Sequence, residues 1–488
     1  MTEDQQLKRK VVTGSFWVFG ANLISRGISF LSTLVLARLL TPEAFGVIGY
    51  GFLIVGAIGL IREMGFNSAL IYQKERIEEA ASTALIFITL WSIFLYALVV
   101  LLAPLAATFF REPRLVNLLR ILTISLILNS LANVPLTLLE KDIRFARRVV
   151  PEVVNLTVYG VLTALFAYLG FNYWSFVIGI LCADICQLII AFILRPIRIR
   201  LKPDIALLKD MFGFGKNVMV LSILNFGIRN VDDFFVGRML GTVSLGVYNF
   251  AYRIANIPAT NITNVFGKIL YPSFRKIADD LDTLRSGFLR SLKYVSLMTI
   301  PLTFYIVLIT PQVIRLFFPH WIEAIIPIQL IAYFGGIRSL GSGIGSVFFA
   351  KGQPGKLLPI TLGQILVIIV LIYPFIKYWG LTGACVVINI SQTYAFIFGI
   401  KITNRILKIS FRDYLNQVKE TVFLSILALT MVFSFRWILD CFIVIEEIGN
   451  FYINVMFIFI YGIFCVGFST DFRGFIKDLR SIRIPNGL

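Results

Sequence analysis

The chain has 488 residues, of which 58% are hydrophobic and 15% are charged, and its formal net charge is +18. Soluble domains contain about 25% charged residues, so this chain has too few polar side chains to cover a water-soluble globule of its length. A disordered chain needs low hydrophobicity and is excluded as well. The composition therefore predicts an integral membrane protein.

Residues that usually carry catalysis are scarce. Only one histidine is present, and the five cysteines lie in or beside apolar runs without a repeated C-x-x-C, so catalytic triads, metal clusters and disulfide frameworks are not indicated. No GxxxxGK[ST] motif is found, and the GSGIGS segment at 341–346 lies in an apolar run with no strand before it. We interpret Gly341 and Gly345 as small residues of helix packing. We expect no cofactor, no metal and no enzymatic activity.

Long apolar runs dominate the chain from its beginning. A helix needs about 20 apolar residues to cross the hydrocarbon, and about 14 such runs are present. They lack the alternation of barrel strands, so an all-α fold is predicted. The first run has no small-residue cleavage site and is interpreted as a retained helix. The runs cover approximately residues 12–36, 43–66, 81–103, 116–139, 150–169, 173–194, 213–237, 245–270, 291–310, 325–350, 358–377, 381–400, 421–439 and 450–469.

Basic residues alternate between the connecting loops. With the N-terminus inside, the N-terminal tail and every second loop carry most of the 45 Lys and Arg residues. The outer loops hold Arg38, Arg111, Arg114, Arg238, Arg315 and Lys377. The positive-inside rule then places both termini in the cytoplasm. The basic loops are thus topology signals and headgroup contacts, and the positive charge does not indicate nucleic-acid binding.

An internal repeat relates the two halves of the chain. Residues 37–47, ARLLTPEAFGV, align without gaps to residues 237–247, GRMLGTVSLGV, and Lys141 and Gly170 correspond to Lys351 and Gly380. Six runs separate the copies, so both have the same orientation in the membrane. We predict an N-terminal lobe of helices 1–6 over residues 1–200 and a C-terminal lobe of helices 7–12 over 201–405. Helices 13–14 and a cytoplasmic tail follow over 406–488. Two facing lobes are typical of alternating access, with the substrate site at their interface.

Polar residues recur at steps of three and four inside several predicted helices, which places them on one helical face. Because charged side chains facing lipid cost about 2.5–3.5 kcal/mol each, we expect these stripes to face a polar, water-filled cavity. The uncharged members of the predicted cavity lining are Asn22, Ser25, Ser29, Asn225, Asn249 and Asn256.

The charged members of the stripes have alternative roles. Arg229 precedes Asp232 and Asp233 by three and four residues, so an intrahelical ion pair is one interpretation and a site for a coupling proton or sodium ion is the other. Arg26 and Arg338 have no acid within one turn. Their guanidinium forks suit phosphate oxygens, so we predict that they bind an anion. Arg62 and Glu63, near the inner end of the second helix, favour local pairing or gating over substrate binding.

The chain resembles bacterial oligosaccharide flippases of the polysaccharide-transporter family, in particular the colanic-acid and teichuronic-acid exporter branch. The likeness is carried by SRGISFLSTLVLARLLTPEAFGVIGYG, MGFNSALIYQKE and NVDDFFVGRMLGTVSLGVYNFAYRIANIP. It implies 14 helices in two lobes, in a superfamily that also contains multidrug antiporters. It further implies a polyprenyl-diphosphate-linked oligosaccharide as substrate, moved from the cytoplasmic to the periplasmic leaflet of the bacterial inner membrane. By position, Arg26, Arg338, Arg253 and Arg229 would bind the anionic headgroup. The implied partners are the bilayer, a polysaccharide polymerase and glycosyltransferases.

Two other functions are weighed against a flippase. A multidrug antiporter of organic cations would favour acidic and aromatic cavity walls, whereas the predicted cavity bears arginines. A membrane-embedded polysaccharide polymerase or sugar transferase would need a sizeable outer catalytic loop, and only short loops are predicted. The sequence therefore favours a flippase in lipopolysaccharide or exopolysaccharide biosynthesis.

Overall fold

The computed structural model describes residues 27–73, 75–142, 145–198, 204–256, 270–442 and 447–468, together with Gly20, Phe266 and Gly267. The regular structure of these residues is helical throughout, and nine of their helices are long and apolar enough to cross a membrane. The predicted all-α class is thus confirmed, while the number of 14 spans and the cytoplasmic termini stay predictions. The chain divides into two compact units, Met1–Gly246 and Val247–Leu488. The lobe boundaries near residues 200 and 405 also stay predictions.

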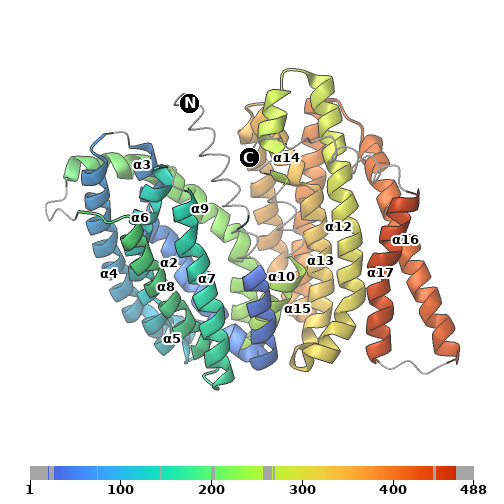
Figure 1. The fold of residues 1–488 in the computed structure, drawn as a ribbon, viewed down its shortest axis with the longest axis horizontal. Helices are drawn as coiled ribbons and strands as arrows, with labels where there is room; N and C mark the ends of the chain where they lie inside the picture. Colours follow the sequence, from blue (N-terminus) through green and yellow to red (C-terminus); the bar gives the residue numbers. More distant parts are fainter. Residues whose placement is uncertain are drawn as a thin grey trace. The chain divides into compact units, whose positions relative to one another are not determined.

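The first unit is a bundle in which long apolar helices run side by side (Figure 1). Thr41 begins α2 by accepting a hydrogen bond from the Ala44 amide, with Pro42 at the first helical position. The left-handed residues Met64 and Gly65 end α2 and turn the chain into α3. The helices are α2 (Pro42–Glu63), α3 (Phe66–Tyr72), α4 (Ile77–Phe110), α5 (Leu115–Leu122), α6 (Ile124–Lys141), α7 (Phe145–Tyr168), α8 (Trp174–Leu194) and α9 (Ile205–Leu240).

One close helix contact in this unit joins the two copies of the aligned motif. The chain continues from α9 into α10 (Thr242–Ala255), and Gly46 of α2 meets Gly246 of α10. A Cβ on Gly46 would lie 1.8 Å from the Thr242 carbonyl oxygen, and one on Gly246 would lie 1.8 Å from the Pro42 carbonyl oxygen. The two glycines, aligned in the sequence repeat, therefore contact each other's helix reciprocally. Backbone approach this close is open only to residues without a Cβ.

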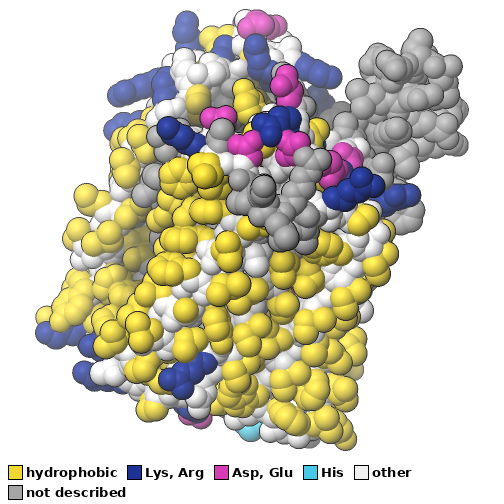
Figure 2. Space-filling model, turned by 90° about the vertical axis from the view of Figure 1, so that its left-hand side faces the viewer, with side chains coloured by type: hydrophobic (Ala, Val, Ile, Leu, Met, Phe, Trp, Pro, Cys, Tyr) yellow, Lys and Arg dark blue, Asp and Glu magenta, His cyan; other side chains and the backbone are white. Residues whose placement is uncertain are grey.

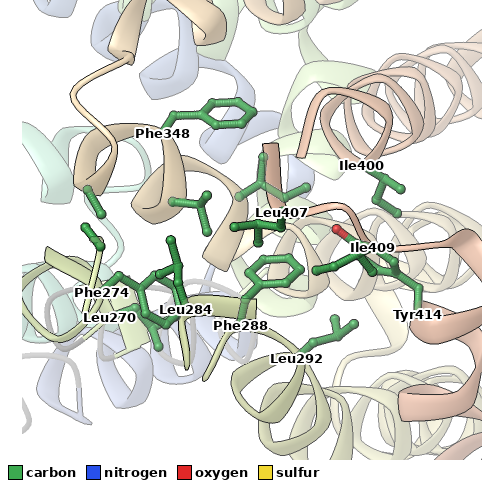
Figure 3. Packing of buried hydrophobic residues seen from close by; sticks show 14 of the residues in the cluster. Leu270, Phe274, Leu284, Phe288, Leu292, Phe348, Ile400, Leu407, Ile409 and Tyr414 are labelled. Carbon is green, nitrogen blue, oxygen red and sulfur yellow. The ribbon is translucent and has the colours of Figure 1, made fainter. Parts of the chain in front are cut away.

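The second unit contains a further set of long helices around its own core. Buried Phe274, Phe288, Phe348 and Tyr414 pack with aliphatic side chains in one cluster (Figure 3). The cluster draws on α12, α14 and α15, the start of α16 and the segments around Phe274 and Ile409. The elements are α12 (Leu281–Phe317), η1 (Pro319–Ala324), α13 (Ile325–Leu340), α14 (Ser342–Ala350), η2 (Pro354–Lys356), α15 (Leu357–Leu407), α16 (Phe411–Phe442) and α17 (Glu447–Phe468).

The 51-residue α15 covers two of the predicted runs, because the chain turns back within it. Gly380 has φ +57° and ψ −136°, a backbone conformation outside the helical region. On either side of this turn, the Gln364 amide donates to Gln392 Oε1 at 3.2 Å. The predicted division into runs 358–377 and 381–400 therefore corresponds to two packed halves of one continuous element. Gly170, the residue aligned with Gly380, also has positive φ and lies between α7 and α8.

The last two helices pack on α12 of the same unit. Buried Val432 and Phe457 join a cluster with Tyr305, and the Tyr461 hydroxyl donates to the Leu297 carbonyl at 3.1 Å. The Asn454 amide donates to the Leu308 carbonyl at 3.4 Å. Buried polar groups in this hairpin thus use the backbone of α12 as their partners, as expected where no water is available.

Most charged side chains on the face in Figure 2 gather towards its upper end and a few basic ones lie towards its lower end, while apolar side chains cover the middle. In the first unit, ion pairs connect residues 70–80, 140–149 and 195–212, which are three of the loops predicted to lie inside. Arg76 pairs with Asp204 at 2.8 Å, and Arg195 pairs with Glu78 at 2.5 Å and Asp142 at 3.4 Å. Segments predicted to share one side of the membrane therefore lie at the same end of this bundle.

Candidate functional site

The predicted polar stripe of the first helix is described only in part. Arg26, Asn22 and Ser25 lie outside the described residues. Ser29 is exposed near the start of the apolar helix Gly27–Leu39. The hydroxyl of Thr33, one turn further on, donates to the Ser29 carbonyl at 2.9 Å, which satisfies that hydroxyl within the helix.

The stripe of α9 places its cation and its acids in different surroundings. Asn225 and Arg229 are exposed, whereas Asp232 is buried and Asp233 is half-buried. Exposure here means access to lipid or to water in a cavity. Because a carboxylate facing lipid is costly, the burial of Asp232 fits a position inside protein.

In the second unit, the structure brings two of the predicted anion-binding arginines onto neighbouring helices. Tyr252 of α10 and Phe334 of α13 lie with ring centroids 6.1 Å apart. Arg253 directly follows that tyrosine and is exposed, and Arg338 comes one turn after Phe334 and is half-buried. Both arginines therefore lie within about one turn of the residues that form this ring contact.

The remaining predicted polar residues of α10 differ in burial. Asn256, at the end of this helix, is buried at 4% exposure, whereas Asn249 is half-buried. Their spacing of seven residues returns them to one side of the helix, on which Arg253 is the exposed member.

A polar cluster that the predictions did not include lies inside the first unit. Asp184 of α8 is 7% exposed and accepts hydrogen bonds from the side-chain amides of Asn129 at 2.8 Å and Asn155 at 3.1 Å. Three helices, α6, α7 and α8, contribute one polar residue each. The available signal was a lone acid within the apolar run 173–194, which is rare inside a membrane span.

Arg62 of α2 is buried at 6% exposure and forms the expected local pair with Glu63, at 3.1 Å. It also donates from Nη1 to the Leu126 carbonyl of α6 at 3.1 Å. The sequence predicted the local pair with Glu63, but it did not predict that Arg62 is buried inside the unit instead of lying at the membrane surface.

A second charged cluster lies between α4 and α5 and reaches the start of α10. Glu112 accepts hydrogen bonds from Arg114 Nε at 2.7 Å and from the Thr242 hydroxyl at 2.6 Å. Burial raises the pKa of Glu112, but the hydrogen bonds and charge of Arg114 and the Thr242 hydroxyl lower it more, so its pKa lies below the ordinary value. Glu112 is therefore held as a carboxylate at neutral pH.

One packing interpretation needs correction. The GSGIGS segment is helical, at the end of α13 and the start of α14, but Gly345 has open space where a Cβ would be, and Gly341 allows ordinary contact. The close approach is instead at Gly343, where a Cβ would lie 3.2 Å from the Phe288 ring. The close contact in this segment is thus made by Gly343 with Phe288 of α12, and not by Gly341 or Gly345.

Among the described residues, nine apolar helices with buried polar clusters between them define a multi-pass membrane protein. The description "Polysaccharide biosynthesis protein" belongs to the family that matches residues 35–326, more than half of the chain. The chain belongs to this family, which confirms the resemblance found in the sequence.

Individual relatives agree with this assignment. The chain is 25% identical over 351 residues to the lipopolysaccharide biosynthesis protein WzxC of Escherichia coli, covering 71% of each chain. It is 23% identical over 428 residues to the teichuronic acid biosynthesis protein TuaB of Bacillus subtilis, covering 85% of this chain and 86% of that protein. The fold is similar to that of the lipid II flippase MurJ in an inward closed conformation, with a TM-score of 0.71 at 16% identity, over 96% of this chain and 100% of MurJ.

Proposed function

We propose that this protein is a flippase that moves polyprenyl-diphosphate-linked oligosaccharide units from the cytoplasmic to the periplasmic leaflet of the bacterial inner membrane. The observation that carries the proposal is a MurJ-like fold along nearly the whole chain, in a member of a polysaccharide biosynthesis family. The reaction is translocation without bond cleavage, so no catalytic residue is required. The unit would serve lipopolysaccharide or exopolysaccharide synthesis, between glycosyltransferases that build it and a polymerase that consumes it.

The proposed architecture has 14 spans in two six-helix lobes, with two further helices and both termini in the cytoplasm. Alternating access would expose a polar cavity between the lobes first to one leaflet and then to the other. The lipid tail would stay in hydrocarbon while the glycan passes through the cavity. The reciprocal contact of Gly46 and Gly246 supports a parallel repeat, because aligned residues meet as related by an approximate two-fold axis.

The diphosphate would be bound by arginines. Arg253 and Arg338 are supported by their positions on helices that contact each other in the second unit. Arg26 and Arg229 are proposed from sequence position, and Asn22, Ser25, Ser29, Asn225, Asn249 and Asn256 would hydrogen-bond the glycan. Guanidinium groups suit this role because each offers two parallel N–H donors to phosphate oxygens. Asp232 and Asp233 are proposed to take part in ion coupling.

The test is deletion of the gene followed by analysis of lipid-linked intermediates. We expect a complete repeat unit to accumulate on the inner leaflet, and the wild-type gene to restore export. A truncated unit would instead indicate an enzyme of assembly, and export of cationic dyes with normal glycan would indicate a multidrug transporter.

Variants of the arginines test the site itself. We expect Arg338→Ala and Arg253→Ala to express and insert but to lose export, with Arg338→Lys retaining less than wild-type export because an ammonium group lacks the bidentate fork. Arg315→Ala, which alters a predicted outer loop, is the matched control and should export normally. Full complementation by the Arg253→Ala/Arg338→Ala double variant would overturn the assignment.

A further inference from the structure

Asp184 lies at the centre of a membrane-spanning helix. It is ten residues from each end of α8, Trp174–Leu194. At 1.5 Å per residue this places it about 15 Å from both ends, the middle of a hydrocarbon core about 30 Å thick. The side chain faces the interior of the first unit, at 7% exposure. An ionisable group held at this depth marks a functional site unless its charge has a purely structural partner.

The neighbours of Asp184 fit a carboxylate that can be charged. Asn129 Nδ2 donates to one carboxylate oxygen and Asn155 Nδ2 donates to the other. An ionised carboxyl only accepts hydrogen bonds, so two amide donors match the charged form. Each oxygen keeps a further lone pair, so there is room for a proton without the loss of either amide contact.

Arg62 supplies the opposite charge. Its guanidinium is buried and donates to the Leu126 carbonyl of α6, one turn before Asn129, which donates to Asp184, so both charges lie against the same stretch of α6. Two of its nitrogens reach the Leu126 carbonyl and Glu63, while Nε has no hydrogen-bond partner among the described residues. Glu63 forms the direct ion pair with Arg62, but its side chain is 45% exposed and its attraction is weakened by solvent, so the buried Asp184 is a second acid that opposes the charge of Arg62.

Other charged groups on the helices packed against α8 have partners or surroundings of their own. On α6, Lys141 at the C-terminal end donates to the Leu70 carbonyl. On α7, Arg148 pairs with Glu152 at 2.5 Å and lies 3.8 Å from Glu140 of α6. On α5, Arg120 is exposed. Arg147 on α7 is exposed as well.

The chemistry of the cluster selects the ion. A sodium ion requires several oxygen ligands, whereas the two side-chain partners of Asp184 present amide N–H donors to its oxygens, and the buried Arg62 adds a positive charge on the same stretch of α6. A proton needs only one carboxylate lone pair. When Asp184 takes up a proton from water, its carboxylate becomes a neutral acid. Arg62 then has Glu63 as its remaining acidic neighbour.

We propose that Asp184 is a proton-binding residue and that Arg62 is its counter-charge, so that each protonation changes the net charge buried between α2 and α8. The link of this step to transport rests on the proposed flippase function. Proton binding itself can be measured on the purified protein without any transport.

The experiment is an infrared titration of the full-length protein in lipid nanodiscs, which detects the C=O stretch of a protonated carboxylic acid. We expect a band that appears on acidification in the wild type and is lost in Asp184→Asn. It should persist in Asp142→Asn, the control at an aspartate of the same unit that pairs with Arg195 beyond the end of α6. In Arg62→Gln, the band should persist to a pH about one unit higher or more, because removal of a nearby positive charge favours the neutral acid.

Several outcomes would contradict the proposal. An unchanged band in Asp184→Asn, its loss in Asp142→Asn, or an unshifted titration in Arg62→Gln would each overturn it. If Asp184→Asn does not fold, Asp184→Glu should retain a titrating band at a displaced midpoint, and an unaltered midpoint would count against Asp184. A normal titration in a protein that moves no lipid-linked glycan would leave the proton site standing and refute the flippase.

Discussion

Glu112 shows how a charged residue becomes fixed at the end of a span. It is 4% exposed, although it lies in the short connection between α4 and α5. Arg114 contacts both of its carboxylate oxygens and also pairs with the more exposed Glu43 at 2.7 Å. The hydrogen bonds from Arg114 and Thr242 stabilise the ionised form more than the neutral form, so their contribution to stability depends on pH.

Replacing Glu112 by Gln should lower the free energy of unfolding by about 1.5–3 kcal/mol, because charge-assisted hydrogen bonds are lost inside the protein. The pKa of Glu112 is below its ordinary value of 4.5 in the folded protein, so its stabilisation is present above that pH and is lost as pH falls through the folded pKa. Thermal unfolding in detergent should therefore show less loss of stability below about pH 4.5 in the variant than in the wild type.

Glu43→Gln is the matched control, since Glu43 pairs with the same arginine but its side chain is 50% exposed. An exposed pair contributes about 0–1 kcal/mol. Equal destabilisation by the two variants would show that burial of Glu112 has no part in the effect.

At the scale of elements, α2 and α10 depend on one residue each for their contact. A Cβ at Gly46 would meet a backbone oxygen, which cannot rotate away. Gly59 lies in the same helix, and a Cβ there would be 3.8 Å from Leu126 Cδ2, an ordinary contact. Alanine substitutions at Gly46 and Gly59 therefore distinguish the effect of helix propensity from the effect of packing.

Gly46→Ala should destabilise the protein by at least about 1–3 kcal/mol through overpacking, despite the helix propensity of alanine. Gly59→Ala should be neutral or stabilise by up to about 1 kcal/mol. Thermal unfolding and the yield of monodisperse protein measure both. Comparable yields and melting temperatures for the two variants would contradict the expected steric clash at Gly46.

At the scale of the whole molecule, lysines aligned in the repeat make equivalent contacts in the two units. Lys141 Nζ donates to the carbonyls of Leu70 at 2.8 Å and Ile71 at 3.2 Å, as well as to that of Gln73, near the C-terminal end of α3. Lys351 Nζ donates to the Ala278 carbonyl at 2.5 Å, just after the helical residues 270–276. Each lysine therefore satisfies backbone carbonyls that a helix end leaves without partners.

Replacement of either lysine by Met preserves length and removes these bonds. We expect Lys141→Met to lower the free energy of unfolding by about 1–3 kcal/mol and Lys351→Met by about 0.5–1.5 kcal/mol, since the first lysine satisfies more carbonyls. Denaturant titration of each variant measures this order. Lys356→Met, on the half-buried residue that ends η2, tests loss of a lysine charge alone and should change stability least.

Composition and periodicity determined the class of this protein and most of its helices. Apolar runs of about 20 residues predict spans because hydrocarbon provides no partner for backbone N–H and C=O groups outside a helix. The alignment of Lys141 with Lys351 and Gly170 with Gly380 likewise anticipated equivalent structure, since helix ends and tight turns depend on a few local residues.

Tertiary structure alone decided which polar residues meet. Asn129, Asn155 and Asp184 are far apart in the sequence and form one cluster because three helices pack side by side. The close approach at Gly343, rather than Gly345, also depended on which face of α14 another helix covers. Local patterns record the preference of a segment for membrane and helix, whereas partners are set by how helices rotate and cross in the folded bundle, which no single segment encodes.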